Sequence, residues 1–173
     1  MKRLAILTPL VALATTLIPS SVVFAQPAGD EVLLQMQQAS RKQDIRALTT
    51  LLPAIQGHPL EVWGHYWALK ARLSSATAQE VEDFLQRWRG TYQEDRLRND
   101  WLLLLGQRRN WAEFERLHTE FRMQDDKQLR CYDLAIASIE GRLPQHASTE
   151  LQQLWMGQPA NDDGCTYAAS TLY

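Results

Sequence analysis

The spacing of large apolar side chains is the feature that most limits the fold of this chain. Val81, Phe84, Leu85 and Trp88 stand at positions i, i+3, i+4 and i+7, the pattern that places apolar side chains on one face of an α-helix. We find no stretch with the alternating apolar and polar residues of a half-buried strand. Only three valines and four isoleucines follow residue 25, so residues that favour strands are scarce. The chain is predicted to be all-α.

Start signals divide the chain into short helices. Thr77 begins the run TAQE, a capping box in which the threonine serves one free amide and Glu80 reaches back to another. The runs NWAE and DDKQ repeat this idea, with Asn110 and Asp125 as the predicted caps. Together with the stop signals below, these signals predict helices over 31–41, 43–52, 60–73, 77–89, 92–105, 110–121, 126–140 and 147–156, and one that begins near residue 163.

Two glycines indicate how the helices are grouped. Gly106 and Gly141 each follow an apolar stretch, where glycine supplies the left-handed backbone of a helix end. They are 35 residues apart, and each stands between an apolar helix and an amphipathic one. A period near 34 residues with paired antiparallel helices is typical of a superhelical solenoid of the tetratricopeptide kind. An antiparallel helical bundle is the alternative.

The first 25 residues have the organisation of a signal peptide. Lys2 and Arg3 precede an apolar run over 4–18, and a small-x-small pattern ends at Ala25. We expect cleavage before Gln26, so that the mature domain begins there. The alternatives are a retained membrane anchor or a buried helix, but prolines and hydroxyl residues interrupt the continuous run of about 20 apolar residues that a span needs.

Export determines the expected surroundings of the mature chain. The short apolar core of the leader favours a bacterial periplasm, an oxidising compartment. Removing Lys2 and Arg3 with the leader leaves 16 basic and 20 acidic residues, a net charge of −4. Nucleic acid is therefore not an expected partner, because its binding depends on clustered positive charge. No membrane association is expected after cleavage.

The only two cysteines are Cys131 and Cys165. In an exported protein such a pair is expected to be joined. The bridge would close a loop of about 35 residues, which the chain-entropy model values at roughly 3 to 4 kcal/mol. It would clamp the helix over 126–140 to the helix that begins near residue 163.

Aromatic and histidine residues suggest few chemical sites. The tryptophans suggest platforms for stacking against sugars, but most fall on apolar stripes and are predicted to be core. For Trp63 and Trp67, near the break at 57–59, both interpretations stay open. The histidines show no metal-ligand spacing. The six tryptophans are Trp63, Trp67, Trp88, Trp101, Trp111 and Trp155, and the four histidines are His58, His65, His118 and His146.

Carboxylates are the remaining candidates for catalysis. A glycosidase needs a carboxyl group in surroundings that raise its pKa, but the candidates lie at helix caps or beside arginines and are predicted to be solvated. We assign no catalytic, cofactor-binding or metal-binding residue. The candidate carboxylates are Glu80, Glu82, Asp83, Glu113, Glu115 and Glu150.

Three segments carry a resemblance to a known family. They contain HPLEVWGHYWAL, then WLLLLGQRRNW over 101–111, and then both cysteines with LW and QP between them. In order and spacing these segments resemble the N-terminal superhelical domain of soluble lytic murein transglycosylases, from about Gln37 to Tyr173. The resemblance implies a curved helical solenoid, a periplasmic location, a Cys131–Cys165 bridge and association with peptidoglycan or other cell-wall proteins.

The catalytic part of that family is not matched. In the family a C-terminal lysozyme-like domain carries a glutamate that protonates the bond between N-acetylmuramic acid and N-acetylglucosamine, and 1,6-anhydro ends result. Its motif, Glu-Ser followed by Gly-Leu-Met-Gln, does not occur in this chain. We therefore expect residues 26–173 to be the N-terminal part of such an enzyme, inactive alone. The alternatives are a complete non-catalytic scaffold that binds a protein or peptidoglycan, and a chain that itself cleaves murein.

Overall fold

The computed structural model describes residues 28–173, and all their regular secondary structure is helical. The prediction of an all-α chain is confirmed for these residues, and every predicted helix has a counterpart. The predicted signal peptide and its cleavage between Ala25 and Gln26 lie outside the described residues. The helices are α1 (Ala28–Arg41), α2 (Ile45–Leu51), α3 (Glu61–Lys70), α4 (Ala78–Arg87), α5 (Tyr92–Gln107), α6 (Trp111–His118), α7 (Lys127–Ile139), α8 (Ala147–Met156) and α9 (Asp163–Leu172), with short 3-10 turns at Leu52–Ile55 and Leu73–Ser75.

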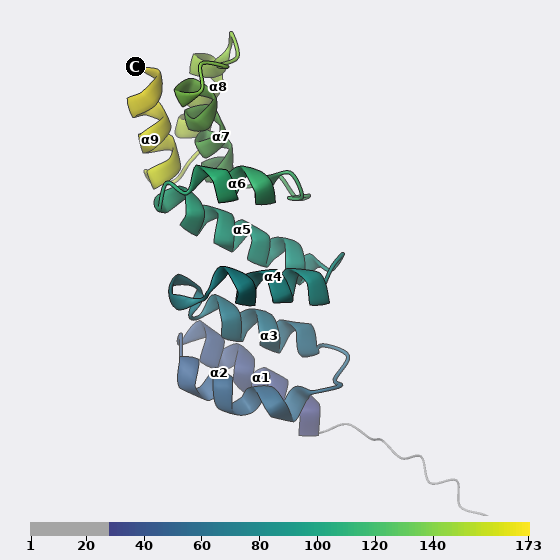
Figure 1. The fold of residues 1–173 in the computed structure, drawn as a ribbon. Coiled ribbons are helices and arrows are strands. Elements are labelled where there is room, and N and C mark those ends of the chain that lie inside the picture. The colour runs from purple at the N-terminus through teal and green to yellow at the C-terminus, as the bar shows by residue number, and fades with distance from the viewer. Residues whose placement is uncertain (1–27) are drawn as a thin grey trace, which may run out of the picture.

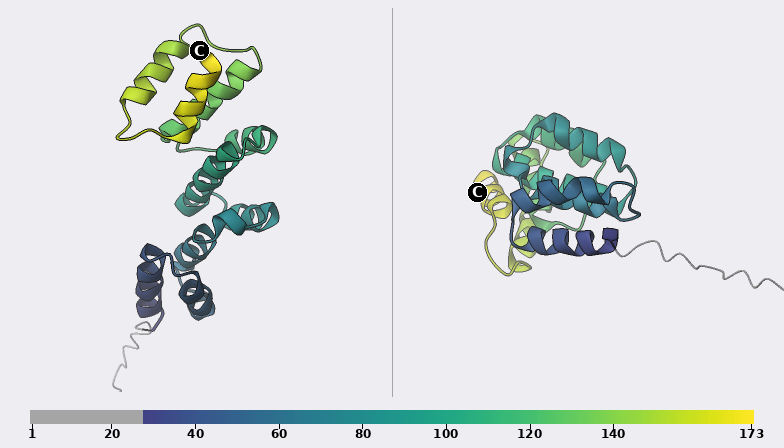
Figure 2. Two further views of the ribbon diagram at one scale, coloured as in Figure 1. Left: turned by 90° about the vertical axis from the view of Figure 1, so that its left-hand side faces the viewer. Right: turned by 90° about the horizontal axis from the view of Figure 1, so that it is seen from below.

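The helices pack in two layers. In the first layer, α1 packs on α3, α3 on α5, α5 on α7 and α7 on α9. In the second, α2 contacts α1 and α3, α4 and α6 contact α5, and α8 contacts α7 and α9. Figure 1 shows the resulting elongated column, with α1 and α2 at one end and the C-terminal residue at the other. In the left panel of Figure 2, α4 and α6 lie to the right of α3 and α5. On the left, α1 lies below α3, and no helix of residues 28–173 lies beside α5.

The apolar core follows the column. One cluster surrounds Met36 between α1 and α3, a larger one extends from α3 to α7, and a third surrounds Cys131 and Cys165. The middle cluster contains fully buried Leu102 and Phe114, which join α5 to α6. Within residues 28–173, no helix is both long and apolar enough to cross a lipid bilayer.

Of the three predicted helix N-caps, one has the predicted hydrogen bonds and two differ from the prediction. Both hydrogen bonds of the predicted capping box between Thr77 and Glu80 are present. The cap of α7 is Asp126 rather than Asp125, because the Asp126 carboxylate accepts from the amides two and three residues later. Asn110 precedes α6, but its side chain makes no cap bond; its backbone amide instead donates to a carbonyl of α5.

The two glycines have different roles. Gly141 ends α7 as predicted, with a φ of 69°, and the amides of Gly141 and Arg142 donate back to the last turn. The prediction for Gly106 is wrong, because this residue lies inside α5. A Cβ atom there would be 2.3 Å from the ring of Tyr132, so its function is close packing of α5 on α7. Arg109, with a φ of 56°, takes the left-handed position after α5.

Candidate functional site

Cys131 in α7 and Cys165 in α9 form a disulfide with a Cα–Cα distance of 4.8 Å. Both side chains are buried, among Leu134, Leu151 and Ala168. The bond therefore lies inside the core that α7, α8 and α9 share. Its position is that of a clamp between two helices, and its sulfur atoms have no access to a substrate.

A second clamp joins α9 to the corner between α5 and α6. The guanidinium of Arg109 donates to both carboxylate oxygens of Asp163, at 2.5 and 2.9 Å, and lies 3.9 Å from the ring centre of Tyr167. The hydroxyl of Tyr132 donates to Asp163 at 2.5 Å. Hydrogen bonding from Arg109 lowers the pKa of Asp163, and burial together with Asp163 raises the pKa of Tyr132. Both pKa shifts arise in the hydrogen-bonded contact that joins α9 to the corner between α5 and α6, and we assign them a structural role.

Buried charged residues at the start of α5 are a feature that the sequence reasoning missed. Glu94 and Asp95 are 1% and 0% exposed. Glu94 accepts hydrogen bonds from Arg98, and the Arg122 guanidinium lies 2.8 Å from it. Asp95 accepts from the backbone amides of Arg122 and Met123, at 3.1 and 2.8 Å. The network thus fixes the segment between α6 and α7 on α5. One sequence pattern could have revealed this buried network. Glu94 and Arg98 are spaced i, i+4, and they lie in line with apolar positions further along α5.

A hollow of about 340 Å³ lies beside this network, between α4, α5 and α6. Arg89, Arg98 and Arg116 line it, but Glu82 and Glu120 lie 3.3 to 3.7 Å from them. Glu120 is shared by Arg89 and Arg98, and Glu82 lies beside Arg116. Each arginine therefore has an acidic neighbour, and the hollow offers little unpaired positive charge to an anionic ligand. It is not a strong candidate for a binding site.

A hollow of about 440 Å³ between α6, α7 and α8 contains a histidine–carboxylate pair. Nδ1 of His118 lies 3.2 Å from Asp133, and Arg130 lies 3.7 Å from the same carboxylate. Burial raises the pKa of Asp133 despite these neighbours. A raised carboxyl pKa occurs both in general acids and in buried ion pairs. Among the polar groups of the described residues, this pair most resembles an acid–base site.

The carboxylates predicted to be solvated lie on the outside of the column, with polar partners. Glu80 pairs with Arg72, Glu115 with Arg142 and Glu150 with Arg130. Arg116 binds both Glu82 and Glu113. Asp83 accepts from Gln79. Within the part of the chain that the structure describes, no three His, Cys, Asp or Glu side chains are placed to hold a metal ion; the four histidines lie in separate segments.

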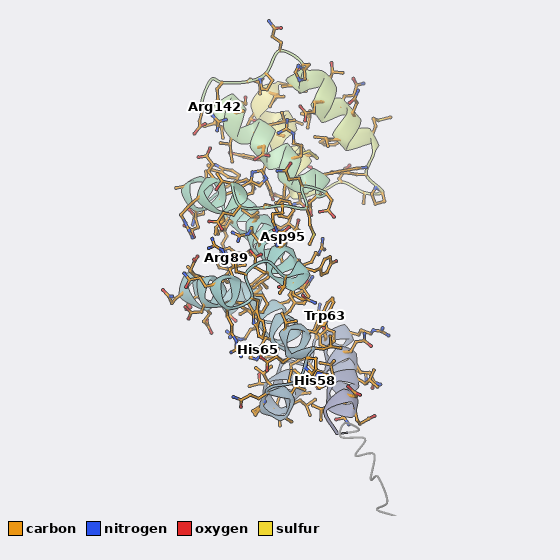
Figure 3. The ribbon with its side chains drawn as sticks, turned by 90° about the vertical axis from the view of Figure 1, so that its right-hand side faces the viewer. His58, Trp63, His65, Arg89, Asp95 and Arg142 are labelled. Atoms are coloured by element: carbon orange, nitrogen blue, oxygen red, sulfur yellow. A yellow bond between two sulfur atoms is a disulfide. The ribbon has the colours of Figure 1, made fainter. Side chains whose placement is uncertain are left out.

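The tryptophans divide into one buried residue and five that are partly exposed. Trp101 is 4% exposed, and the others pack against the core from its edge. Trp63 in α3 differs in its neighbours: its ring centre is 5.6 Å from that of Trp67 and 6.0 Å from that of Tyr92. Tyr92 is 57% exposed. In Figure 3, Trp63 lies toward the opposite side of the column from Arg89.

Polar groups adjoin these rings. Asp100 in α5 accepts hydrogen bonds from the hydroxyl of Tyr66 at 2.8 Å and from Lys70 at 3.0 Å. Aromatic rings with hydrogen-bonding groups beside them are the composition of many ligand sites. This side of α3 and α5 is the best candidate surface of the described residues. Comparison with protein-family models, curated proteins and solved structures gave no match to this chain.

Proposed function

We propose that the chain is a helical-repeat scaffold, a solenoid whose units are about 34 residues long. The proposal rests on contacts that recur between residues 34 positions apart in the sequence. Residues one unit apart are in contact in four places along the column, which is expected when equivalent positions of successive units face each other. The pairs are Tyr66 with Asp100, Arg108 with the carbonyl of Ser74, Arg116 with Glu82, and Cys131 with Cys165.

We further propose that this scaffold is the N-terminal part of a periplasmic lytic murein transglycosylase and associates with peptidoglycan. The resemblance of three segments to that family supports the proposal, together with the leader pattern and the buried disulfide. The family's cleavage reaction would then depend on a separate lysozyme-like domain, and this segment would position the enzyme. A scaffold that acts alone, and binds a protein or peptidoglycan, is the alternative.

Cosedimentation tests the association with peptidoglycan. The full-length chain, purified from the periplasm with its disulfide formed, is mixed with insoluble murein sacculi and centrifuged. We expect the chain to sediment with the sacculi and to stay in solution without them. A chain that remains in solution at every sacculus concentration would contradict the proposal.

A murein zymogram tests whether the chain cleaves peptidoglycan by itself. We expect no clearing, because the paired outer carboxylates are poor general acids. Asp133 is the carboxyl group to test by substitution if clearing occurs. Clearing that disappears in Asp133→Asn and persists in Glu150→Gln would replace the scaffold proposal with a catalytic one.

A further inference from the structure

We infer that the uncovered side of α3 and α5 binds the glycan strand of peptidoglycan, through Trp63, Tyr92 and Arg96. We call these three residues the aromatic face. The inference rests on the proposed association with peptidoglycan and adds to it the surface and the chemical class of the ligand, a β-linked chain of N-acetylated sugars.

The two rings form a supported platform. Trp63 is backed by Trp67 and by the edge of Tyr66, whose ring centres lie 5.6 and 6.1 Å from its own. Tyr92, the first residue of α5, leans on Trp63 at an interplanar angle of 44° and remains largely exposed. A sugar ring presents C–H groups on its faces, and these pack against aromatic rings that are already held in place. Clustered exposed aromatic surface is also a mark of interaction sites.

Arg96 supplies hydrogen-bond donors beside the platform. It follows Tyr92 by one helical turn and is partly buried. Arg98, Arg109 and Arg116 each have a carboxylate partner, whereas the guanidinium of Arg96 has no hydrogen bond or ion pair with another described residue. Its donors are therefore available to the acetamido carbonyls or hydroxyl groups of a sugar.

The nearest acidic group on α5 is already engaged. Asp100 receives Lys70 and the hydroxyl of Tyr66, so its charge is largely neutralised where it adjoins Arg96. Lys70 is engaged in the same contact. Arg96 is thus the uncommitted cation of the aromatic face. This balance suits an uncharged sugar chain better than the peptide stems of peptidoglycan, whose several carboxylates would need several free cations.

The surroundings of Tyr92 leave room for an extended ligand. A hollow of about 430 Å³ adjoins its ring and is lined by Gly90, Thr91, Asp95, Arg122 and Met123. On the left side of α3 and α5 in Figure 2, α1 lies below α3, and the described part of the chain places no helix beside α5. Figure 3 places Trp63 away from Arg89 and Arg142 and toward that open side. A strand could therefore continue from Trp63 across Tyr92.

Two binding measurements test the aromatic face in the full-length chain. Tryptophan fluorescence is titrated with chitotetraose, an uncharged chain of N-acetylglucosamine, and cosedimentation uses insoluble chitin, the long polymer of the same sugar, beside intact sacculi. Tyr92→Ala and Arg96→Gln are the test variants, because both residues lie outside the buried core. Tyr173→Ala removes an aromatic ring that is 85% exposed at the far end of the column, and serves as the control.

We expect wild type and Tyr173→Ala to bind chitotetraose and chitin equally. Tyr92→Ala should weaken binding by roughly 2- to 10-fold, the change that loss of one aromatic contact produces, with unchanged circular dichroism. If wild type binds neither these sugar chains nor intact sacculi, the association with peptidoglycan fails as well. If wild type binds and both test variants bind as tightly as wild type, the association with peptidoglycan stands, but the aromatic face is not the binding surface. Binding to intact sacculi but to neither chitotetraose nor chitin would point to the peptide stems and overturn the inference.

Discussion

Arg109 and Asp163 are 54 residues apart in the sequence and face each other through two parallel hydrogen bonds of 2.5 and 2.9 Å. Arg109 also has a φ of 56°, a left-handed conformation that costs a non-glycine residue about 1 to 2 kcal/mol. The same guanidinium donates to the carbonyl of Gly106 at 2.6 Å. The bonds of the side chain thus stabilise a turn that the backbone alone disfavours, and they hold α9 against the end of α5.

Two substitutions at Arg109 separate these contributions. Arg109→Ala removes the hydrogen bonds and keeps the backbone strain, so we expect it to lower the free energy of unfolding by about 2 kcal/mol. Arg109→Gly removes the same bonds but relieves the strain, so its loss should be smaller by about 1 kcal/mol. Urea denaturation followed by circular dichroism measures both. Equal losses would show that the left-handed turn is not strained.

Removal of the disulfide should loosen α9 more than the rest of the column. Because both sulfurs are buried, Cys131→Ala together with Cys165→Ala is a better test than serine substitution. We expect a loss of roughly 3 kcal/mol from the chain-entropy effect and faster amide exchange in α9, with α3 and α4 unchanged. Wild type in reducing agent is the matched control. Uniform protection across α3 and α9 in the double variant would contradict a local clamp.

The packing of Gly106 on Tyr132 gives a third prediction. Gly106→Ala would place a Cβ atom 2.3 Å from that ring, and we expect overpacking to cost about 1 to 3 kcal/mol. Gly141→Ala is a contrasting variant, because its Cβ would meet open space and only the φ of 69° is unfavourable. The double variant Gly106→Ala, Tyr132→Leu should lose less than the sum of its single changes. Strict additivity in thermal unfolding would mean that the two residues do not conflict.

Helix positions can be read from the sequence because they depend on neighbours three or four residues away. The stripe that contains Val81 and Phe84 is one example, and the Thr77 capping box is another. The role of Gly106 cannot be read in this way, because it depends on Tyr132 in a different helix. A glycine that makes room for a ring and a glycine that ends a helix look alike when only the adjacent residues are known.

The candidate surface can be foreseen only in part. The place of Trp63 near a break marks it as a candidate for stacking, but its contact with Tyr92 depends on how α3 packs on α5. For a related reason, the sequence shows only part of the network around Glu94 and Asp95: the i, i+4 spacing indicates the Glu94–Arg98 pair, but not the donors from the later segment. Charged side chains are usually exposed, and these two are buried because arginine and backbone donors from a later segment reach them. Such partners are set by tertiary packing.

Asp95 should be among the charged positions of the chain that are most sensitive to substitution, because it is fully buried and receives two backbone amides. Asp95→Ala would leave those two amides without an acceptor and remove a buried charge from beside two arginines, and we expect a loss of about 2 to 4 kcal/mol. Asp95→Asn keeps one acceptor oxygen and should lose less. Amide exchange at Arg122 and Met123 should accelerate in both. The control is Asp83→Ala, an exposed change expected to stay within about 0.5 kcal/mol.

Glu80 should make the stability of the chain depend on pH in the acid range. Hydrogen bonds from Arg72, then from the amide and hydroxyl of Thr77, lower the pKa of Glu80 to about 2 from its ordinary value of 4.5. Because the folded pKa is depressed, the stabilisation is present above pH 4.5 and is lost as the pH falls toward 2. Glu80→Gln should therefore be less stable at pH 7 and lose less stability on acidification.

Urea midpoints measured between about pH 7 and about pH 2 test this dependence. The curves of wild type and Glu80→Gln should converge toward the acid end, since protonated Glu80 and glutamine are both uncharged. Glu31→Gln, in an exposed position of α1 whose carboxylate accepts a hydrogen bond from the uncharged amide of Gln35, should leave a curve parallel to that of wild type. Parallel curves for Glu80→Gln as well would show that the capping box keeps its strength when Glu80 is protonated.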